Sequence, residues 1–503
     1  MFAEGNTSQS TCDPLSGKLI YGSIGEFTQQ KEYIIMTAPL NSRSEFYGSA
    51  QGAGSEISSL AALVGAVRAV ATQSHCLKPN EIILDPPFFG NRTLVFGLFP
   101  GSTFGNFGGH RFVCNIRKGQ DEKLEERKDK YANISFDRIK GIISLGELSG
   151  DEYEDKRRNK DIQLFIHKEH TTQESSDLQQ LAVQIAQDAK QEEKMYYQTI
   201  LGPTSIEQTP GIPPSPASAF IEENNSIPII HICSHGNKFS NPFHHSRLDQ
   251  YYDSQLTCDA STLAARIAVQ KLMGDQTDII NDTLLQSIQA NCTEIHQMLE
   301  CLISNSSCEL IRQTLKLRST PKDDFMSNDC TVAYRLFSQN IVPIQSAMAA
   351  RMLQNAVGKQ GNKCSKADDC DKGQTCEQGT CYITPIYLHS VYSPRLNYNS
   401  STGKFKQSDY CRRTNKSINT DNANEQMKGI KQKKIKSIGV FEEGEKLNEN
   451  EIMEENTDES QYIDSNYDEI WTEILAAGIL SVLLSILFFV VLRTYFAAKL
   501  KKA

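Results

Sequence analysis

The sequence predicts an α+β ectodomain with a disulfide-rich C-terminal part, followed by a disordered stalk and one C-terminal transmembrane helix. Strand-like and helix-like patterns occur in blocks, without a regular alternation of strand and helix. Eight of the fourteen cysteines lie between positions 292 and 381. Positions 474–492 form an uncharged run of nineteen residues, long enough to cross the hydrocarbon core of a bilayer.

Composition divides the 503 residues into six segments. They are an α+β unit with a Phe- and Gly-rich stretch at 1–118, a charged and amphipathic helical region with a Pro-rich linker at 119–217, an α+β Cys-rich domain at 218–411, a flexible acidic stalk at 412–470, a transmembrane helix at 474–492 and a basic tail at 493–503. Between 442 and 469 the stalk holds twelve acidic residues and one lysine, so it cannot bury enough apolar surface to fold.

Hydrophobic periodicity places the main elements along the folded part. Short strands are predicted at 18–24 and 31–37, a buried strand at 227–233 and stranded chain near 382–391. Helices are predicted at 55–72, 175–200, 261–273, 278–303 and 344–356. The charged stretch at 119–160 is predicted to be a solvated helix or an exposed segment.

The predicted anchor runs from Ile474 through Leu483 and Phe489 to Leu492. The basic tail that follows it favours a cytosolic C-terminus with the bulk of the chain outside. The first ten residues have no basic or apolar segment of the kind that begins a cleavable signal, which favours insertion after translation and a cytosolic bulk. The sequence therefore leaves both orientations open.

The clustered cysteines are predicted to form disulfides. The candidates are Cys292, Cys301, Cys308, Cys330, Cys364, Cys370, Cys376 and Cys381. The last four form a module at 364–381 with almost no apolar side chains, so that crosslinks are expected to hold it together. A zinc site is the alternative for this module, although its cysteine gaps are long and it contains no histidine. Nine Asn-x-Ser/Thr sequons make glycosylation possible if the bulk is lumenal.

A Phe- and Gly-rich run extends from 86 to 112. Two interpretations remain open: strands and turns with paired aromatic rings, or a segment that inserts phenylalanines into a membrane or partner. The residues proposed for such contact are Phe88, Phe89, Phe96, Phe99, Phe104 and Phe107. Its glycines lack the Lys-Ser/Thr of a phosphate-binding loop, which excludes a P-loop.

One group of residues has the pattern of a catalytic site. The apolar run 227–233 ends in Ser-His235-Gly236, and Cys292 follows His235 by 57 residues. This segment resembles the His-Gly motif of caspase-like cysteine proteases, which implies His235 as general base and Cys292 as thiolate. The Gly expected after that cysteine is absent, and 278–303 has a helical pattern where the family has a strand. We therefore assign no catalytic residue, with His235 and Cys292 as the alternative.

The same region offers a metal site as a further alternative. Its donors would be His231, His235, His244 and His245 with Cys233, although their spacing fits no standard ligand set. We expect no metal and no cofactor.

The layout of the chain resembles the C-terminally anchored envelope and fusion proteins of large DNA viruses. That resemblance implies a non-enzymatic, single-pass protein of the virion membrane, with a role in attachment, fusion or assembly. The expected partners are the lipid bilayer and other membrane or virion proteins. The net charge of −9 argues against nucleic acid. The alternatives are a membrane-tethered caspase-like protease and a protist cell-surface glycoprotein.

Overall fold

The computed structural model describes the folded part of the chain with gaps. The described residues are 16–25, 27–42, 52–76, 89–103, 105–121, 134–149, 163–168, 172–202, 212–236, 239, 241–274, 285–304, 308–310, 344–365, 369, 375–377, 380–383, 386–392, 396–399 and 404–407. The predicted stalk, anchor and basic tail lie outside these residues, as do Phe88 and Phe104 and the disulfide candidates Cys330 and Cys370.

The centre of the protein is an eight-stranded mixed sheet with the order β11-β1-β3-β2-β4-β7-β5-β6. Its strands are β1 (Ser16–Ile24), β2 (Glu32–Pro39), β3 (Arg92–Phe99), β4 (Ile139–Leu145), β5 (Gln163–Lys168), β6 (Gln198–Leu201), β7 (Ile229–Cys233) and β11 (Ile386–Tyr392). The four strands β3, β2, β4 and β7 pair in parallel, whereas β1 and β5 join this group antiparallel. The central strands are buried along almost their whole length, as expected for a sheet covered on both faces.

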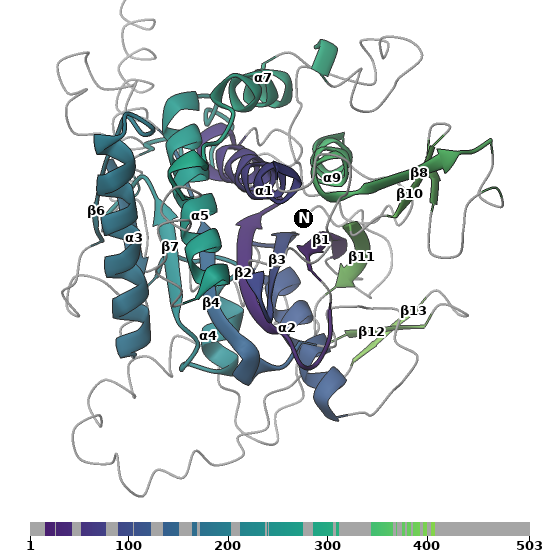
Figure 1. Cartoon of the computed structure of the whole chain (residues 1–503). Coiled ribbons are helices and arrows are strands. Elements are labelled where there is room, and N and C mark those ends of the chain that lie inside the picture. The colour runs from purple at the N-terminus through teal and green to yellow at the C-terminus, as the bar shows by residue number, and fades with distance from the viewer. Residues whose placement is uncertain are drawn as a thin grey trace, which may run out of the picture.

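In the described part of the chain, five longer helices cover one face of the sheet (Figure 1). They are α1 (Ser58–Cys76), α3 (Gln173–Gln191), α5 (Ser254–Met273), α7 (Cys292–Ile303) and α9 (Ile344–Val357). Helix α1 continues a turn of π-helix, η1 (Ala53–Ile57). Asp253 caps the start of helix α5, where its side chain accepts a hydrogen bond from the Leu256 N–H at 2.8 Å. Such a cap satisfies one of the free N–H groups at a helix start.

An arginine inside this helical layer ties α5 to its neighbours. Arg266 is 1% exposed. Its Nε donates to the Ile288 carbonyl at 2.9 Å, and its Nη1 lies 2.9 Å from a carboxylate oxygen of Glu192. A buried guanidinium is stable only with such partners, so Arg266 connects α5 to the ends of two other segments.

Two helices, α2 (Phe107–Asp121) and α4 (Ser218–Glu223), pack on the opposite face of the sheet. Aromatic rings dominate this second core. The Phe99 and Phe112 ring centroids are 5.4 Å apart, and those of Phe112 and Phe220 are 6.0 Å apart. The protein is therefore a three-layer arrangement, with the sheet between two helical layers.

The remaining strands form two small sheets near the β1–β11 end of the main sheet (Figure 1). One contains β8 (Lys359–Lys363), β10 (Thr380–Ile383) and β9 (Thr375–Glu377), and the other contains β12 (Leu396–Asn399) and β13 (Lys404–Gln407). A turn of 3-10 helix, η4 (Phe136–Arg138), precedes β4. Cys364 and Cys381, from the predicted cysteine module, are each disulfide-bonded.

The prediction of a mixed helix-and-strand protein is confirmed, and its finer organisation differs. The main sheet takes strands from the segments 1–118, 119–217 and 218–411, so the predicted boundaries do not separate it. The charged segment 119–160 contains the buried strand β4, which was predicted to be exposed. The helix predicted at 175–200 ends at Gln191, and β6 follows it.

Within the described residues, one helical stretch, Ala53–Thr72, is long and apolar enough to cross a membrane. Of that stretch, 94% is buried inside the protein. It is the central helix of the larger core, where it packs against α5, α7 and α9.

Candidate functional site

The carboxyl ends of the parallel strands gather polar side chains at one edge of the sheet. Glu147 follows β4, and His235 follows β7. The loop 241–250 and the start of η1 lie beside them, joined by the hydrogen bonds described below. In open α/β sheets this edge is where ligands and chemistry are usually found. It is therefore the candidate site in the described part of the chain.

Glu147 is the central acid of this edge. Its side chain is 2% exposed, and its Oε2 lies 2.6 Å from Nδ1 of His244. Its other oxygen accepts hydrogen bonds from the Ser149 hydroxyl at 2.8 Å and from the Asn241 N–H at 3.2 Å. Burial alone would raise the pKa of Glu147, but the hydrogen bond and charge of His244, with the charge of His235, lower it to about 2. The carboxylate is therefore ionised and fully engaged by its neighbours.

Asp249 is a second buried acid, and it holds the start of η1. Its carboxylate oxygens accept the Gly54 N–H at 3.0 Å and the Ser55 N–H at 3.1 Å. The Asn241 side chain donates to it at 2.8 Å and so links the two acids. Burial raises the pKa of Asp249 to about 6, with a contribution from the Glu56 carboxylate, while hydrogen bonds from Ser55 oppose the rise. A carboxylate at this position complements the positive end of the helix.

The adjacent histidines complete the network. Nε2 of His245 lies 3.2 Å from a carboxylate oxygen of Glu56, which is itself 4% exposed. The rings of His244 and Phe239 stack at 3.7 Å between centroids, and the two histidine rings lie 3.8 Å apart. His244 is thus held by the Glu147 carboxylate and His245 by the Glu56 carboxylate, while the two imidazole rings lie against each other.

A second group lies at the end of β7. The possible ligand atoms of His167, Cys233 and His235 all fall within 4.8 Å of one another, and all three residues are buried. His231, two residues before Cys233, instead places its Nδ1 3.0 Å from the Ser144 hydroxyl. Of the predicted donors, the structure therefore brings Cys233 and His235 together, adds His167 from β5, and separates His231.

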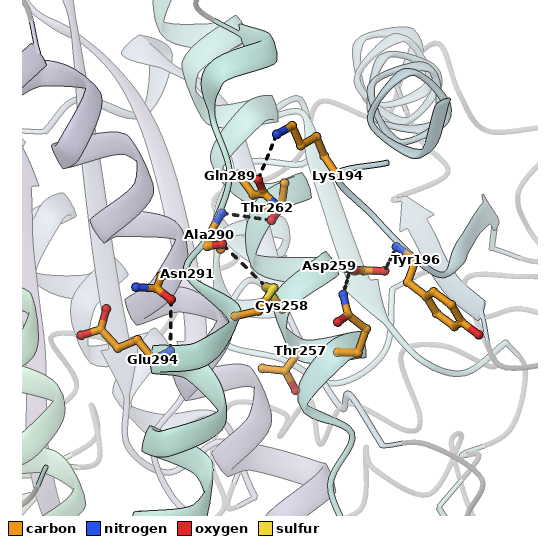
Figure 2. Close-up of a disulfide and its surroundings, with 12 residues drawn as sticks. Lys194, Tyr196, Thr257, Cys258, Asp259, Thr262, Gln289, Ala290, Asn291 and Glu294 are labelled. Atoms are coloured by element: carbon orange, nitrogen blue, oxygen red, sulfur yellow. Dashed lines mark hydrogen bonds between the residues drawn. A yellow bond between two sulfur atoms is a disulfide. The ribbon is translucent and has the colours of Figure 1, made fainter. Parts of the chain in front are cut away.

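Cys292 does not face this group as a free thiol. It is the first residue of α7 and forms a disulfide with Cys258 of α5. Figure 2 shows the junction, where the Ala290 N–H donates to the Thr262 hydroxyl at 3.1 Å and Asn291 caps α7 through its bond from the Glu294 N–H. A second disulfide joins Cys301 and Cys308. Because the sulfur of Cys292 is already bonded, it cannot act as a thiolate nucleophile.

The other thiol of interest is Cys233. Among the cysteine side chains that the structure describes, it is free and fully buried. Burial raises its pKa well above the ordinary range, and the Glu147 carboxylate adds to the rise. Without a bound cation the neutral thiol is therefore the stable form, and it is a poor nucleophile.

The phenylalanines proposed for membrane or partner contact form part of the core instead. Phe89, Phe96, Phe99 and Phe107 are between 0% and 4% exposed. Phe96 faces the larger helical layer, while Phe99 and Phe107 belong to the aromatic core on the other face. Phe96 and Phe99 are buried because their strand, β3, is central and covered on both faces. Phe107 is buried at the start of α2, and Phe89 packs in the larger core. The contact interpretation is therefore wrong for these four residues.

Three important residues of the edge were missed by sequence reasoning. Glu147 follows a buried strand, but the surrounding charges masked that strand. Asp249 lies in a polar loop with no repeating pattern. His167 is 66 positions before Cys233, and only the antiparallel pairing of β5 with β7 brings the two close. The strand-end rule applied to β4 would have pointed to Glu147.

Comparison with known proteins gives a consistent result. A family model described as the nicastrin large lobe matches residues 32–283, half of the chain. Nicastrin from Arabidopsis thaliana is 25% identical over 420 residues, which are 79% of this chain and 57% of that protein. Nicastrin from Dictyostelium purpureum is 22% identical over 410 residues, 78% of this chain and 58% of that protein. The chain thus spans less than two thirds of the length of these relatives.

The comparison with solved structures also finds a nicastrin. The crystal structure of the γ-secretase component nicastrin superposes with a TM-score of 0.59 at 18% identity, over 80% of this chain and 66% of that one. At this identity the likeness concerns the fold alone.

These matches overturn the earlier functional interpretations. The chain is not a viral envelope protein, so its expected location in a virion membrane and its expected virion partners are wrong as well. The alternatives also fail: the caspase-like protease has its proposed nucleophile in a disulfide, and the matched family replaces the protist surface glycoprotein. Because the nicastrin model covers half of its length, this chain belongs to the nicastrin family.

Proposed function

We propose that this protein is a non-catalytic, membrane-anchored subunit of a γ-secretase-type complex. The observation that carries the proposal is the nicastrin large-lobe match, which covers the strands β2 to β7 of the main sheet and its candidate edge. The solved relative is a γ-secretase component. The role of the chain is then to contribute a folded ectodomain to a larger membrane assembly.

The state of the edge supports a non-catalytic role. Its two acids bind partners within the protein. Glu147 contacts His244 and accepts a hydrogen bond from Asn241, and Asp249 accepts one from the start of η1. A general base needs a pKa near the working pH and access to a substrate proton. Glu147, with a pKa of about 2 and 2% exposure, has neither. The edge acts as a polar connection between the strand ends and the η1–α1 segment.

The anchor and orientation are part of the same proposal. The uncharged run 474–492 crosses the bilayer, and the basic tail stays in the cytosol. The disulfides Cys258–Cys292 and Cys301–Cys308 favour an ectodomain in the oxidising lumen. Two sequon asparagines, Asn91 and Asn291, lie exposed on the folded part, where a glycan can be attached.

The orientation is tested by mapping glycans on the full chain purified from membranes. We expect occupancy at Asn91 and Asn291, with loss of each glycan in the Asn→Gln variants. A chain from a secretory membrane with no glycan at any sequon and with Cys258 reduced would contradict the lumenal orientation.

The assembly role is tested by affinity purification of the full chain in a mild detergent. We expect the other subunits of γ-secretase to co-purify in fixed ratio. A matched chain in which 474–492 is replaced by an unrelated transmembrane helix shows whether the anchor itself contributes to assembly. Recovery of the full chain alone, in intact membranes that contain those subunits, would refute the proposal.

A further inference from the structure

The cluster at the end of β7 has the composition of a metal site. His167, Cys233 and His235 are 2%, 0% and 2% exposed, and their possible ligand atoms lie within 4.8 Å of one another. Two imidazoles and one thiol are the donor types that zinc-class cations prefer, whereas calcium and magnesium prefer oxygen. Clusters of buried titratable groups are enriched at functional sites, so this cluster is a candidate site.

The strand pairing places these residues together. In the antiparallel pair β5–β7, Phe165 lies opposite Cys233, and His167 lies opposite His231. Opposed residues of such a pair share one face of the sheet, so His167 and Cys233 are diagonal neighbours on that face. His235 lies two residues beyond the end of β7, and its ring is close to both His167 and Cys233. The position of the cluster is therefore fixed by backbone pairing rather than by flexible side chains.

Two donors already converge on one point. Nε2 of His167 lies 2.8 Å from the His235 carbonyl oxygen, and Sγ of Cys233 lies 3.4 Å from the same oxygen. The polar hydrogens on these two atoms point at that carbonyl oxygen. A cation bound to the nitrogen and the sulfur would take the place of both hydrogens, and the His235 carbonyl would turn away to make room for it.

We propose that His167, Cys233 and His235 bind a divalent cation of the zinc class, separate from the Glu147–Asp249 network. In the binding step the Cys233 thiol gives its proton to solvent, and the sulfur then forms a bond to the cation through its electron pair. His167 transfers its ring hydrogen to the other nitrogen, so that a neutral imidazole provides the second donor. His235 provides the third donor from its ring.

The surroundings balance the charge. A divalent cation with one thiolate and two neutral imidazoles leaves one positive charge in a buried place. The ionised carboxylate of Glu147 is close enough to interact electrostatically with both Cys233 and His235. The cation would therefore link β5 to β7 and stabilise the antiparallel end of the main sheet.

The test uses the full chain in detergent micelles, stripped with a chelator and dialysed. Zn²⁺ alone is added, and bound metal is measured by elemental analysis together with the melting temperature. Co²⁺ is used in parallel because a cobalt–thiolate bond gives an intense near-ultraviolet charge-transfer band. We expect one equivalent of tightly bound metal, a higher melting temperature and the cobalt–thiolate band.

Variants identify the ligands. Cys233→Ser is expected to remove the cobalt–thiolate band and the thermal shift, and His167→Gln to weaken metal binding at least tenfold. The matched control is His296→Gln, an exposed histidine on α7, which should bind as the parent does. A parent chain without the cobalt–thiolate band overturns the proposal even if the variants fail to fold. Full retention of the band in Cys233→Ser overturns it as well.

Discussion

Replacing Glu147 by Gln tests whether the polar edge stabilises the fold. The substitution keeps the size of the side chain and one oxygen acceptor but removes the charge that faces His244. The pKa of Glu147 is lowered from 4.5 to about 2 in the folded protein. This difference corresponds to about 3 kcal/mol of folding stability at neutral pH, which the variant should lose.

The sign of the pH dependence follows from the lowered pKa. A carboxylate with a depressed folded pKa contributes its full stabilisation above its unfolded pKa, and the contribution is lost as the pH falls toward the folded pKa. The stability difference between parent and Glu147→Gln should therefore be largest above pH 4.5 and shrink toward pH 2. As the pH falls from 4.5 to 2, the free energy of unfolding decreases more steeply for the parent than for the variant.

The assay is urea unfolding of the full chain followed by far-ultraviolet circular dichroism. Tryptophan fluorescence is unsuitable because the single tryptophan, Trp471, lies beside the predicted anchor. Glu300→Gln, an exposed change on α7, is the control and should stay within about 0.5 kcal/mol of the parent. His244→Gln should cost a similar amount to Glu147→Gln, and the double variant less than their sum. Equal stability of parent and Glu147→Gln at pH 7 would show that the Glu147 charge does not stabilise the fold.

Three further predictions concern packing and crosslinks. Gly146→Ala would place a methyl group 2.2 Å from an imidazole nitrogen on β7, whereas Gly141→Ala on the same chain segment meets its nearest neighbour at 3.6 Å. Thermal unfolding should show a loss of about 1–3 kcal/mol for the first and little change for the second, and equal effects would contradict the packing. Removing the Cys258–Cys292 disulfide, which closes a loop of 34 residues, should cost about 4 kcal/mol in urea unfolding. No loss on its reduction would argue against that bond. Arg266→Ala should destabilise the protein by roughly 3–5 kcal/mol, because it leaves a carboxylate and buried carbonyls without their partner. A change below about 1 kcal/mol would show that these groups find other partners.

The local spacing of apolar residues was sufficient to predict many strands and helices of the fold. The strand 18–24, the helix 55–72 and the buried strand 227–233 each correspond to observed elements, because their apolar residues repeat at the period of the structure they form. The pattern did not reveal β4, whose short apolar run Ile139–Leu145 is surrounded by charged residues. It also could not give strand order, since pairing partners are set by long-range packing.

The candidate site was harder to predict for the same reason. His235 and Cys233 are two positions apart in sequence, and the strand-end rule identified their position. His167 joins them only through the pairing of β5 with β7, which leaves no local signal. Cys292 was placed opposite His235 by a spacing analogy, whereas the packing of α5 against α7 instead sets it beside Cys258.

The most direct test of the proposed role is an electron cryo-microscopy structure of the assembly that co-purifies with this chain from its own membranes. We expect the nicastrin-like ectodomain on the lumenal side, attached by one helix to a larger transmembrane region made by the other subunits of γ-secretase. A particle containing this chain alone, with its own anchor as the whole transmembrane region, would contradict that role.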